Sequence, residues 1–260
     1  MLVNYNEIDK DVDSLLHFLP GNSFTPCSYN VLLDGFRDRF LVKIFLLRSL
    51  WGDASEPKFN NWDIFLNDYL KSIENDKNII GIGHSIGGNL LLKAAILKPE
   101  KFNKIILLDP TFFRPYIIRA WKVINFLNMQ KYFLPLVIAA ENKRMEFKSI
   151  EEMFKSYRKN KIFIKFNDSD LQRLVESLVE QKNEKVQLIY PANWDARIYK
   201  KGLLNDMFIW RNIEKLDVDT IIIRGGQSDV FIEKTENLVL KKNKNIKVRS
   251  IRDSDHLFPI

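Results

Sequence analysis

The stretch that decides the fold is Asn78–Gly87, with the sequence NIIGIGHSIG. Its first six residues form a short apolar run typical of a buried β-strand. The residues that follow, Ile86–Leu97, are expected to form a helix. Gly83-His84-Ser85-Ile86-Gly87 joins the two and has the pattern G-x-S-x-G, which predicts a sharp strand–turn–helix element with Ser85 at the turn.

A serine at such a turn can act as a nucleophile. Its strained backbone would project Oγ outward, and Gly83 and Gly87 would leave room where the helix crosses the strand. The N–H of Ile86, at the helix N-terminus, would point to where negative charge develops. The pattern also arises by chance in about one chain in ten of this length. A plain glycine-rich turn is therefore the alternative, but the strand–turn–helix context favours Ser85 as nucleophile.

A serine nucleophile needs a base, and the chain has three histidines. The side chain of His84 would point away from Ser85 Oγ, and His17 lies near the N-terminus. His256 follows the last expected strand, so we expect it to be the base.

The base needs a carboxylate to orient its ring, and Asp229 is the expected one. It follows a strand that ends at Gly225-Gly226, and the chain order Ser85, Asp229, His256 fits this kind of turn. Asp109 also closes a strand and is the main rival. Each of these carboxylates could instead serve as a turn or helix-cap residue.

The second N–H donor to a developing oxyanion is expected from the loop Pro20–Phe24 (PGNSF), where glycine allows close approach of the backbone. We assign it to Asn22, with Ser23 next. An ordinary turn explains this loop equally well.

The rest of the chain alternates apolar runs with helical patterns. A helix is expected at Trp62–Ile73, and further strands are expected at Ser14–Phe18, Phe40–Leu47, Lys104–Leu108, Thr220–Arg224 and Ile246–Ile251. Such strands predict a mostly parallel sheet covered on both faces, with ligands at the carboxyl ends of its strands.

Residues 112–215 break this rhythm. They carry helical patterns at Phe113–Met129, Ser149–Tyr157 and Asp168–Gln181, and no convincing buried strand. We expect a helical cap at 112–215, inserted into a core made of 1–111 and 216–260.

Composition excludes several classes of protein. The chain is 46% hydrophobic and 28% charged, an ordinary globular balance, and it has no apolar run long enough to span a membrane. Its net charge of +7 is scattered, so a nucleic-acid partner is not expected. The single Cys27 and the absence of a secretory leader pattern favour a cytoplasmic protein. Motifs for ATP, catalytic zinc or NAD are missing, so neither a metal nor a cofactor is expected.

Together these pieces resemble the α/β-hydrolase superfamily. The resemblance rests on PGNSF, GHSIGG, LLDP, RGGQSD and DHLF, which lie toward both ends of the chain. Within the superfamily, residues 149–157 and 190–199 are similar to cap segments of esterase- and lipase-like members. The resemblance implies two-step acyl transfer: Ser85 attacks, His256 carries the proton, and water releases the acyl-enzyme.

Three features depart from the family pattern. Relatives commonly have His-Gly where this chain has Pro20-Gly21. Few residues precede that loop, so we expect the usual first hairpin to be shortened or absent. Relatives also continue into a helix after the histidine, whereas this sequence ends at Ile260, four residues after His256.

The expected substrate is a small uncharged ester with an apolar, short-to-medium acyl group. Phe112, Phe113, Tyr116 and Trp121 are candidates to line its pocket, although for any one of them sealing the cap onto the core is the more common role. Arg114, Arg119 and Lys122 are expected to line a solvated helix face rather than to meet an anionic lipid surface. Stable membrane insertion is not expected, and the sequence predicts no oligomeric state.

Two other classes of function stay open. One is different chemistry on the same residues, such as C–C bond hydrolysis, thioester cleavage or acyl transfer. The other is a non-catalytic binding protein on the same fold.

Overall fold

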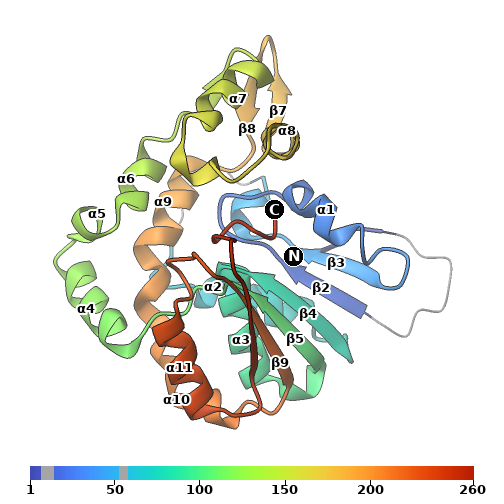
Figure 1. Cartoon of the computed structure of the whole chain (residues 1–260), viewed down its shortest axis with the longest axis vertical. Helices are drawn as coiled ribbons and strands as arrows, with labels where there is room; N and C mark the ends of the chain where they lie inside the picture. Colours follow the sequence, from blue (N-terminus) through green and yellow to red (C-terminus); the bar gives the residue numbers. More distant parts are fainter. Residues whose placement is uncertain (7–14, 53–57) are drawn as a thin grey trace.

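The computed structural model describes residues 1–6, 15–52 and 58–260. Ser14, expected to begin a strand, lies outside these ranges. A seven-stranded sheet forms the centre, in the order β1-β3-β2-β4-β5-β9-β10 (Figure 1). Its strands are β1 (Leu2–Asn4), β2 (Leu15–Leu19), β3 (Leu41–Phe45), β4 (Ile79–His84), β5 (Phe102–Leu108), β9 (Asp219–Gly225) and β10 (Lys247–Ile251).

The sheet is parallel except at one edge, where β1 pairs antiparallel with β3. The expectation of a mostly parallel sheet flanked by helices is therefore confirmed. The three-residue β1 pairs with β3, and residues 7–14 between β1 and β2 lie outside the described ranges, so the shortened first hairpin stays a prediction.

Helices are distributed between the core and the segment inserted after β5. The core contains α1 (Asn30–Leu33), α2 (Asp63–Ser72), α3 (Ile86–Leu97) and α11 (Glu233–Lys242). The inserted segment contains α4 (Pro115–Phe126), α5 (Gln130–Phe133), α6 (Pro135–Glu141), α7 (Ile150–Arg158), α8 (Asp168–Ser177), α9 (Ala192–Lys201) and α10 (Met207–Asn212).

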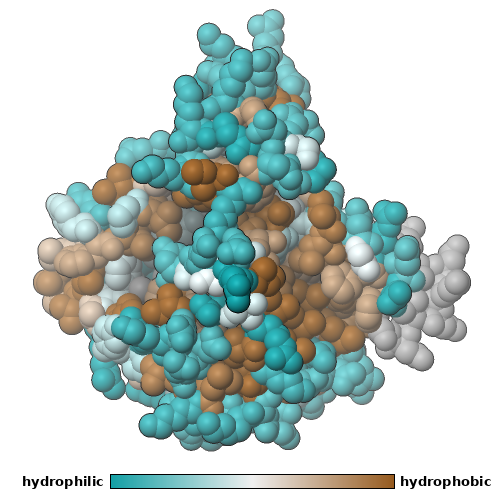
Figure 2. All heavy atoms as spheres, in the orientation of Figure 1, coloured by the Kyte–Doolittle hydropathy of each residue, from teal (hydrophilic) through white to brown (hydrophobic). Residues whose placement is uncertain are grey.

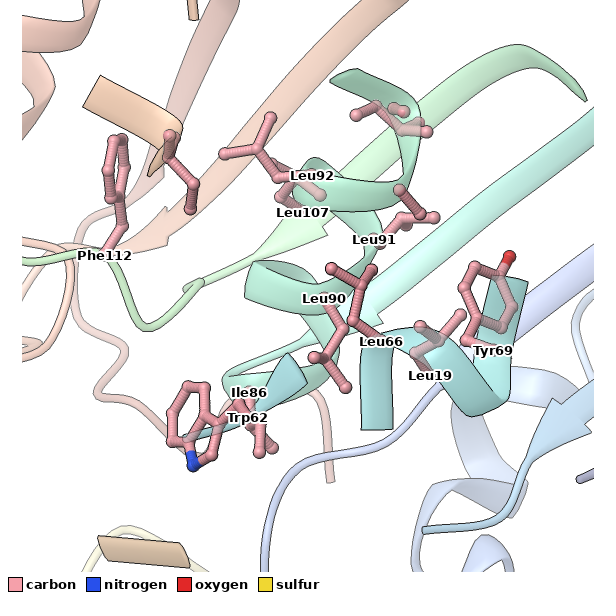
Figure 3. Packing of buried hydrophobic residues seen from close by; sticks show 14 of the residues in the cluster. Leu19, Trp62, Leu66, Tyr69, Ile86, Leu90, Leu91, Leu92, Leu107 and Phe112 are labelled. Carbon is pink, nitrogen blue, oxygen red and sulfur yellow. The ribbon is translucent and has the colours of Figure 1, made fainter. Parts of the chain in front are cut away.

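The two faces of the sheet bury separate apolar clusters. On one face, α2 and α3 pack side by side on the sheet, and Leu90 and Leu91 of α3 lie close to Leu66 and Tyr69 of α2 and to Leu19 of β2 (Figure 3). The other face buries Phe18, Val42 and Ile82, which contact the segment around α1. Along β2, β3, β4, β5 and β9, side chains divide between the two clusters, so both faces of this part of the sheet are covered.

The inserted segment contains strands that the sequence did not suggest, and it packs around a small apolar cluster that Leu257 of the last loop also joins. β6 (Glu146–Phe147), β8 (Lys185–Leu188) and β7 (Val179–Lys182) form an antiparallel sheet in that order, which packs with α7 and α8. The helix expected to continue to Gln181 ends at Ser177 instead. Strand β7 begins two residues later, at Val179. It turns back into β8 through a tight connection in which Asn183 has a φ of 55°. These strands bury few side chains, which explains why they lack an apolar run.

The start of α3 lies against the end of β2 with no room for a side chain. A Cβ at Gly87 would fall 2.0 Å from the carbonyl oxygen of Leu19, and one at Gly83 would fall 2.6 Å from that of Gly87. Backbone atoms on both sides of the turn cannot give way easily, so glycine is required at both positions.

We expect Gly87→Ala to lower the free energy of unfolding by about 3 kcal/mol or more, because backbone must move to admit the methyl group. Urea unfolding of the purified protein measures this change. Gly35→Ala is the matched control, since its Cβ would meet nothing nearer than 3.4 Å and its effect should stay below about 1 kcal/mol. Equal stability of the two variants would contradict the crowding argument.

Candidate active site

Ser85 lies at the turn between β4 and α3 with a φ of 54° and a ψ of −118°. This conformation is strained for a residue with a side chain. Hydrogen bonds hold it on both sides: the Ser85 N–H donates to Leu108 O (3.1 Å), and the Thr111 N–H donates to Ser85 O (3.0 Å). The end of β5 therefore fixes the backbone from which Ser85 Oγ projects.

His256 links the Ser85 hydroxyl to a carboxylate. Its Nε2 lies 3.0 Å from Ser85 Oγ, and its Nδ1 lies 2.6 Å from Oδ2 of Asp109. The side chain of His256 is 23% exposed whereas that of Asp109 is fully buried. Because a carboxylate only accepts, Nδ1 carries the proton and Nε2 accepts from the serine hydroxyl when the imidazole is neutral.

Asp109 is held as an acceptor by several donors. The Gly225 N–H donates to its Oδ1 at 3.2 Å, and the Ser228 hydroxyl donates to its Oδ2. Asp109 itself follows β5 at a φ of 41°. These bonds fix the direction in which the carboxylate meets His256.

The assignment of Asp229 as the carboxylate partner of His256 was wrong in geometry. Asp229 is exposed, and the partner of Nδ1 is Asp109, the rival position. The reason lies in the turn after β9, which packs so closely on the last loop that a Cβ at Gly225 would fall 2.4 Å from Asp255 O. In this tight turn Ser228, not Asp229, faces the interior. The signal for Asp109 was its place at the end of β5, the neighbour of β4.

Thr111 is a site residue that sequence reasoning missed. Its Oγ1 lies 3.1 Å from Ser85 Oγ, and its carbonyl oxygen accepts from Asn89 Nδ2 at 2.7 Å. When Ser85 donates to His256, the Thr111 hydroxyl is free to donate to Ser85 Oγ. The sequence did offer a signal, because Thr111 is only two residues beyond Asp109, the rival carboxylate.

His84 joins three loops behind the turn. Its Nε2 lies 2.9 Å from the carbonyl oxygen of His256, so Nε2 must be the donor. Its Nδ1 then accepts from the Tyr29 hydroxyl at 2.7 Å, and that hydroxyl in turn accepts from the Gly21 N–H at 2.9 Å. The chain of bonds ties the loop at Gly21 to the segment that carries His256.

The loop of Asn22 and Ser23 is anchored to the inserted segment by Asp195 of α9. Asn22 Nδ2 and Ser23 Oγ both donate to Oδ1 of Asp195 at 2.6 Å, and Lys143 Nζ lies 3.0 Å from its Oδ2. Tyr190 donates to Asn22 Oδ1 at 2.7 Å. The side chain of Asn22 is thus fully engaged, and only its backbone N–H is open to another acceptor within the described ranges.

Ile86 is the first residue of α3, so its N–H has no acceptor within the helix. Ile86 directly follows Ser85, and the loop of Asn22 follows β2, the neighbour of β4 in the sheet. The assignment of these two N–H groups to an oxyanion stays a prediction.

The four aromatic residues expected at a substrate pocket have different surroundings. Phe112 is fully buried and stacks on Trp210, with ring centroids 4.5 Å apart. Trp121 is also buried, and its indole N–H donates to Lys200 O. Phe113 is half-buried, whereas Tyr116 is exposed beside the Arg114 guanidinium. Phe112 and Trp121 thus contribute to packing between elements.

A buried polar cluster on α3 adjoins Thr111 through the side chain of Asn89. Asn89 Nδ2 donates to Asp206 Oδ1 at 2.8 Å, and Lys93 Nζ lies 3.8 Å from the same oxygen. Burial raises the pKa of Asp206 to about 6, although the nearby Lys93 opposes the change. The cluster connects the helix of the nucleophile to the turn before α10.

Within the described ranges, no three His, Cys, Asp or Glu side chains gather as they would around a metal ion. In the same ranges, no helix is long and apolar enough to cross a bilayer.

The burial of His84 predicts how stability changes with pH. Burial lowers the pKa of His84 well below 6.5, and the adjacent His256 lowers it further. In the unfolded chain this histidine binds a proton near pH 6.5, whereas in the native protein His84 stays neutral. The free energy of unfolding therefore falls as pH drops below 6.5, by about 1.4 kcal/mol per pH unit for this group. His17, whose pKa burial also lowers, adds to the same trend.

NMR titration of the imidazole resonances tests this directly. We expect the His84 ring to stay neutral, with its proton on Nε2, from pH 7.5 to 5.5. Protonation of His84 near pH 6.5 in the native protein would contradict the account.

The comparisons with known proteins agree with this architecture. A family model described as the alpha/beta hydrolase fold matches residues 52–260. A search of curated proteins found no match.

Solved structures resemble the chain over most of its length. An E-2-(acetamidomethylene)succinate hydrolase superposes with a TM-score of 0.70 at 16% identity, covering 94% of this chain and 84% of the other. A Mycobacterium tuberculosis esterase gives a TM-score of 0.71 at 14% identity, covering 95% and 80%. The thioesterase domain of the curacin biosynthetic pathway gives 0.70 at 12% identity, covering 100% and 90%. At these identities the likeness concerns the fold.

Proposed function

Because the chain belongs to the alpha/beta hydrolase fold family, we propose that it is a serine hydrolase that cleaves carboxylic esters through an acyl-enzyme on Ser85. The observation that carries the proposal is His256, whose two ring nitrogens reach Ser85 Oγ and Asp109 Oδ2. A nucleophile, a base and an orienting carboxylate in this geometry are the parts that acyl transfer needs.

The reaction would proceed in two halves. Ser85 Oγ attacks the ester carbonyl carbon while its proton passes to His256 Nε2, and the resulting imidazolium is stabilised by the buried Asp109 carboxylate. The N–H groups of Ile86 and Asn22 would donate to the oxyanion. His256 then protonates the leaving alkoxide as the C–O bond breaks. In the second half His256 removes a proton from water, which attacks the acyl carbon, and Ser85 leaves with that proton.

Thr111 would assist the first step. Its hydroxyl, 3.1 Å from Ser85 Oγ, can donate to the oxygen as the proton departs and so stabilise the developing negative charge. It also limits the rotation of the serine side chain before attack.

The proposed substrate is a small ester with an apolar acyl group. Apolar residues at the start of the inserted segment support an uncharged substrate. Among them, Phe112 is buried in packing, whereas its neighbour Phe113 is half-buried and is therefore the candidate to contact the acyl group. The protein is proposed to need no metal or cofactor for this reaction, because the three side chains supply the nucleophile and both proton transfers.

The test is labelling by a fluorophosphonate, followed by intact-mass analysis and by rate measurements on p-nitrophenyl esters of increasing acyl length. We expect one adduct on Ser85, no adduct in Ser85→Ala, and turnover of the esters above that of thioesters with the same acyl group. An unlabelled but folded wild type, or faster thioester turnover, would contradict the proposal.

Substitution of the two candidate carboxylates, Asp109 and Asp229, should have very different effects on kcat. Asp109→Asn should lower kcat by about 10⁴-fold, because an amide at this position holds His256 in the wrong tautomer. Asp229→Asn is the matched control and should change kcat less than about twofold, since Asp229 is exposed. Steady-state kinetics of both variants on one ester decides between them, and the reverse ranking would overturn the role of Asp109.

A further inference from the structure

The outer side of α4, α5 and α6 exposes large apolar side chains. We call this surface the outer cap face; it comprises Tyr116, Val123, Phe126, Leu127, Tyr132, Phe133, Leu136 and Ile138. Phe126 is 82% exposed, Tyr132 69% and Phe133 58%. Apolar atoms gather at the left edge of the molecule in Figure 2, where Figure 1 places these helices. An exposed apolar surface of this kind commonly marks an interaction site.

This exposure is additional to the packing of the same helices. α4 already buries Ile118 and Trp121, and α6 buries Val137 and Ala140. On α4, Tyr116, Val123 and Phe126 recur at helical spacing on the side away from these buried residues. The helices are therefore apolar on two sides, and only the inner side is covered by this chain.

The charges within the outer cap face have one sign, and Glu141, which ends α6 beside it, is already paired with Lys200. No acidic residue occurs from Pro115 to Ala140, although the whole chain has 33. Arg119, Lys122 and Lys131 are exposed in this interval, and none forms an ion pair with any residue that the structure describes. An apolar surface with exposed cations and no anions is complementary to an anionic lipid surface.

The same charges disfavour a second copy of this chain as the occupant. A two-fold symmetric interface would bring each patch against its own equivalent, so Arg119, Lys122 and Lys131 of both copies would meet without acidic partners. Anionic headgroups instead supply the missing negative charge, while the acyl boundary accepts the aromatic rings.

We propose that the outer cap face docks reversibly on an anionic lipid bilayer. Phe126, Tyr132 and Phe133 enter the headgroup region, and the neighbouring cations contact lipid phosphates. The docked protein lies on the bilayer and does not span it. This inference goes beyond the proposed function and does not depend on it. It also changes the expectation that Arg119 and Lys122 merely line a solvated helix face.

The test is co-sedimentation of the full chain with vesicles of phosphatidylcholine mixed with phosphatidylglycerol, compared with pure phosphatidylcholine. We expect binding to the anionic vesicles that weakens at high salt. The double variants Phe126→Ser/Phe133→Ser and Arg119→Glu/Lys122→Glu should each weaken binding at least about tenfold. Because all four side chains lie at the surface, the thermal midpoints should stay near that of the wild type.

Matched controls come from other parts of the chain. Ile164→Ser removes an apolar side chain that is 73% exposed outside the outer cap face, and Lys241→Glu/Lys244→Glu makes the same change in net charge on and beyond α11. Both should bind like the wild type. Ser85→Ala should also bind normally, which separates this test from that of the proposed function.

Three results would overturn the proposal. The first is no binding to the anionic vesicles. The second is equal weakening by the control variants, which would indicate a general charge effect. The third is a dimer in light scattering that Phe126→Ser/Phe133→Ser abolishes while vesicles do not bind, which would assign the surface to a second copy.

Discussion

The crossing of α3 over the ends of β2 and β4 is the constraint on which the site depends. Ser85 adopts a positive φ where β4 turns into α3, at a cost of about 1 to 3 kcal/mol, and Gly87 in the same turn leaves no space for a Cβ beside Leu19 O. Packing of Leu90 and Leu91 in the main apolar cluster supplies the stabilisation that offsets this strain. Oγ is presented outward as a consequence of how helix and strand meet.

The same crossing determines which groups reach Ser85. The end of β5 lies beside the turn, so Asp109 and Thr111 arrive from one short segment, while His256 arrives from the loop after β10. His84 then bonds to the backbone of His256 and, through Tyr29, to Gly21. His84 is therefore buried and neutral, and it positions the backbone of His256, whose ring stays partly accessible. The two roles follow from their difference in burial.

Local patterns predicted the elements around the site more accurately than the pairing of side chains across it. The helix expected at Ile86–Leu97 has those bounds, and β4 and β9 each match their expected runs within one or two residues. Those elements are encoded by continuous apolar runs. The choice between Asp109 and Asp229 depended on how tightly the turn after β9 packs on the last loop, a contact between residues far apart in sequence. The sequence analysis also missed Thr111 and the strands β7 and β8, because none of them is marked by a strong local pattern.

The central claim is that Ser85, His256 and Asp109 work as one unit. The rate of phosphonylation of Ser85 in His256→Ala, Asp109→Asn and the double variant tests it most directly. If Asp109 acts only through His256, the double variant reacts no more slowly than His256→Ala alone. Multiplied effects of the two substitutions would show that Asp109 acts on its own, and would contradict the account.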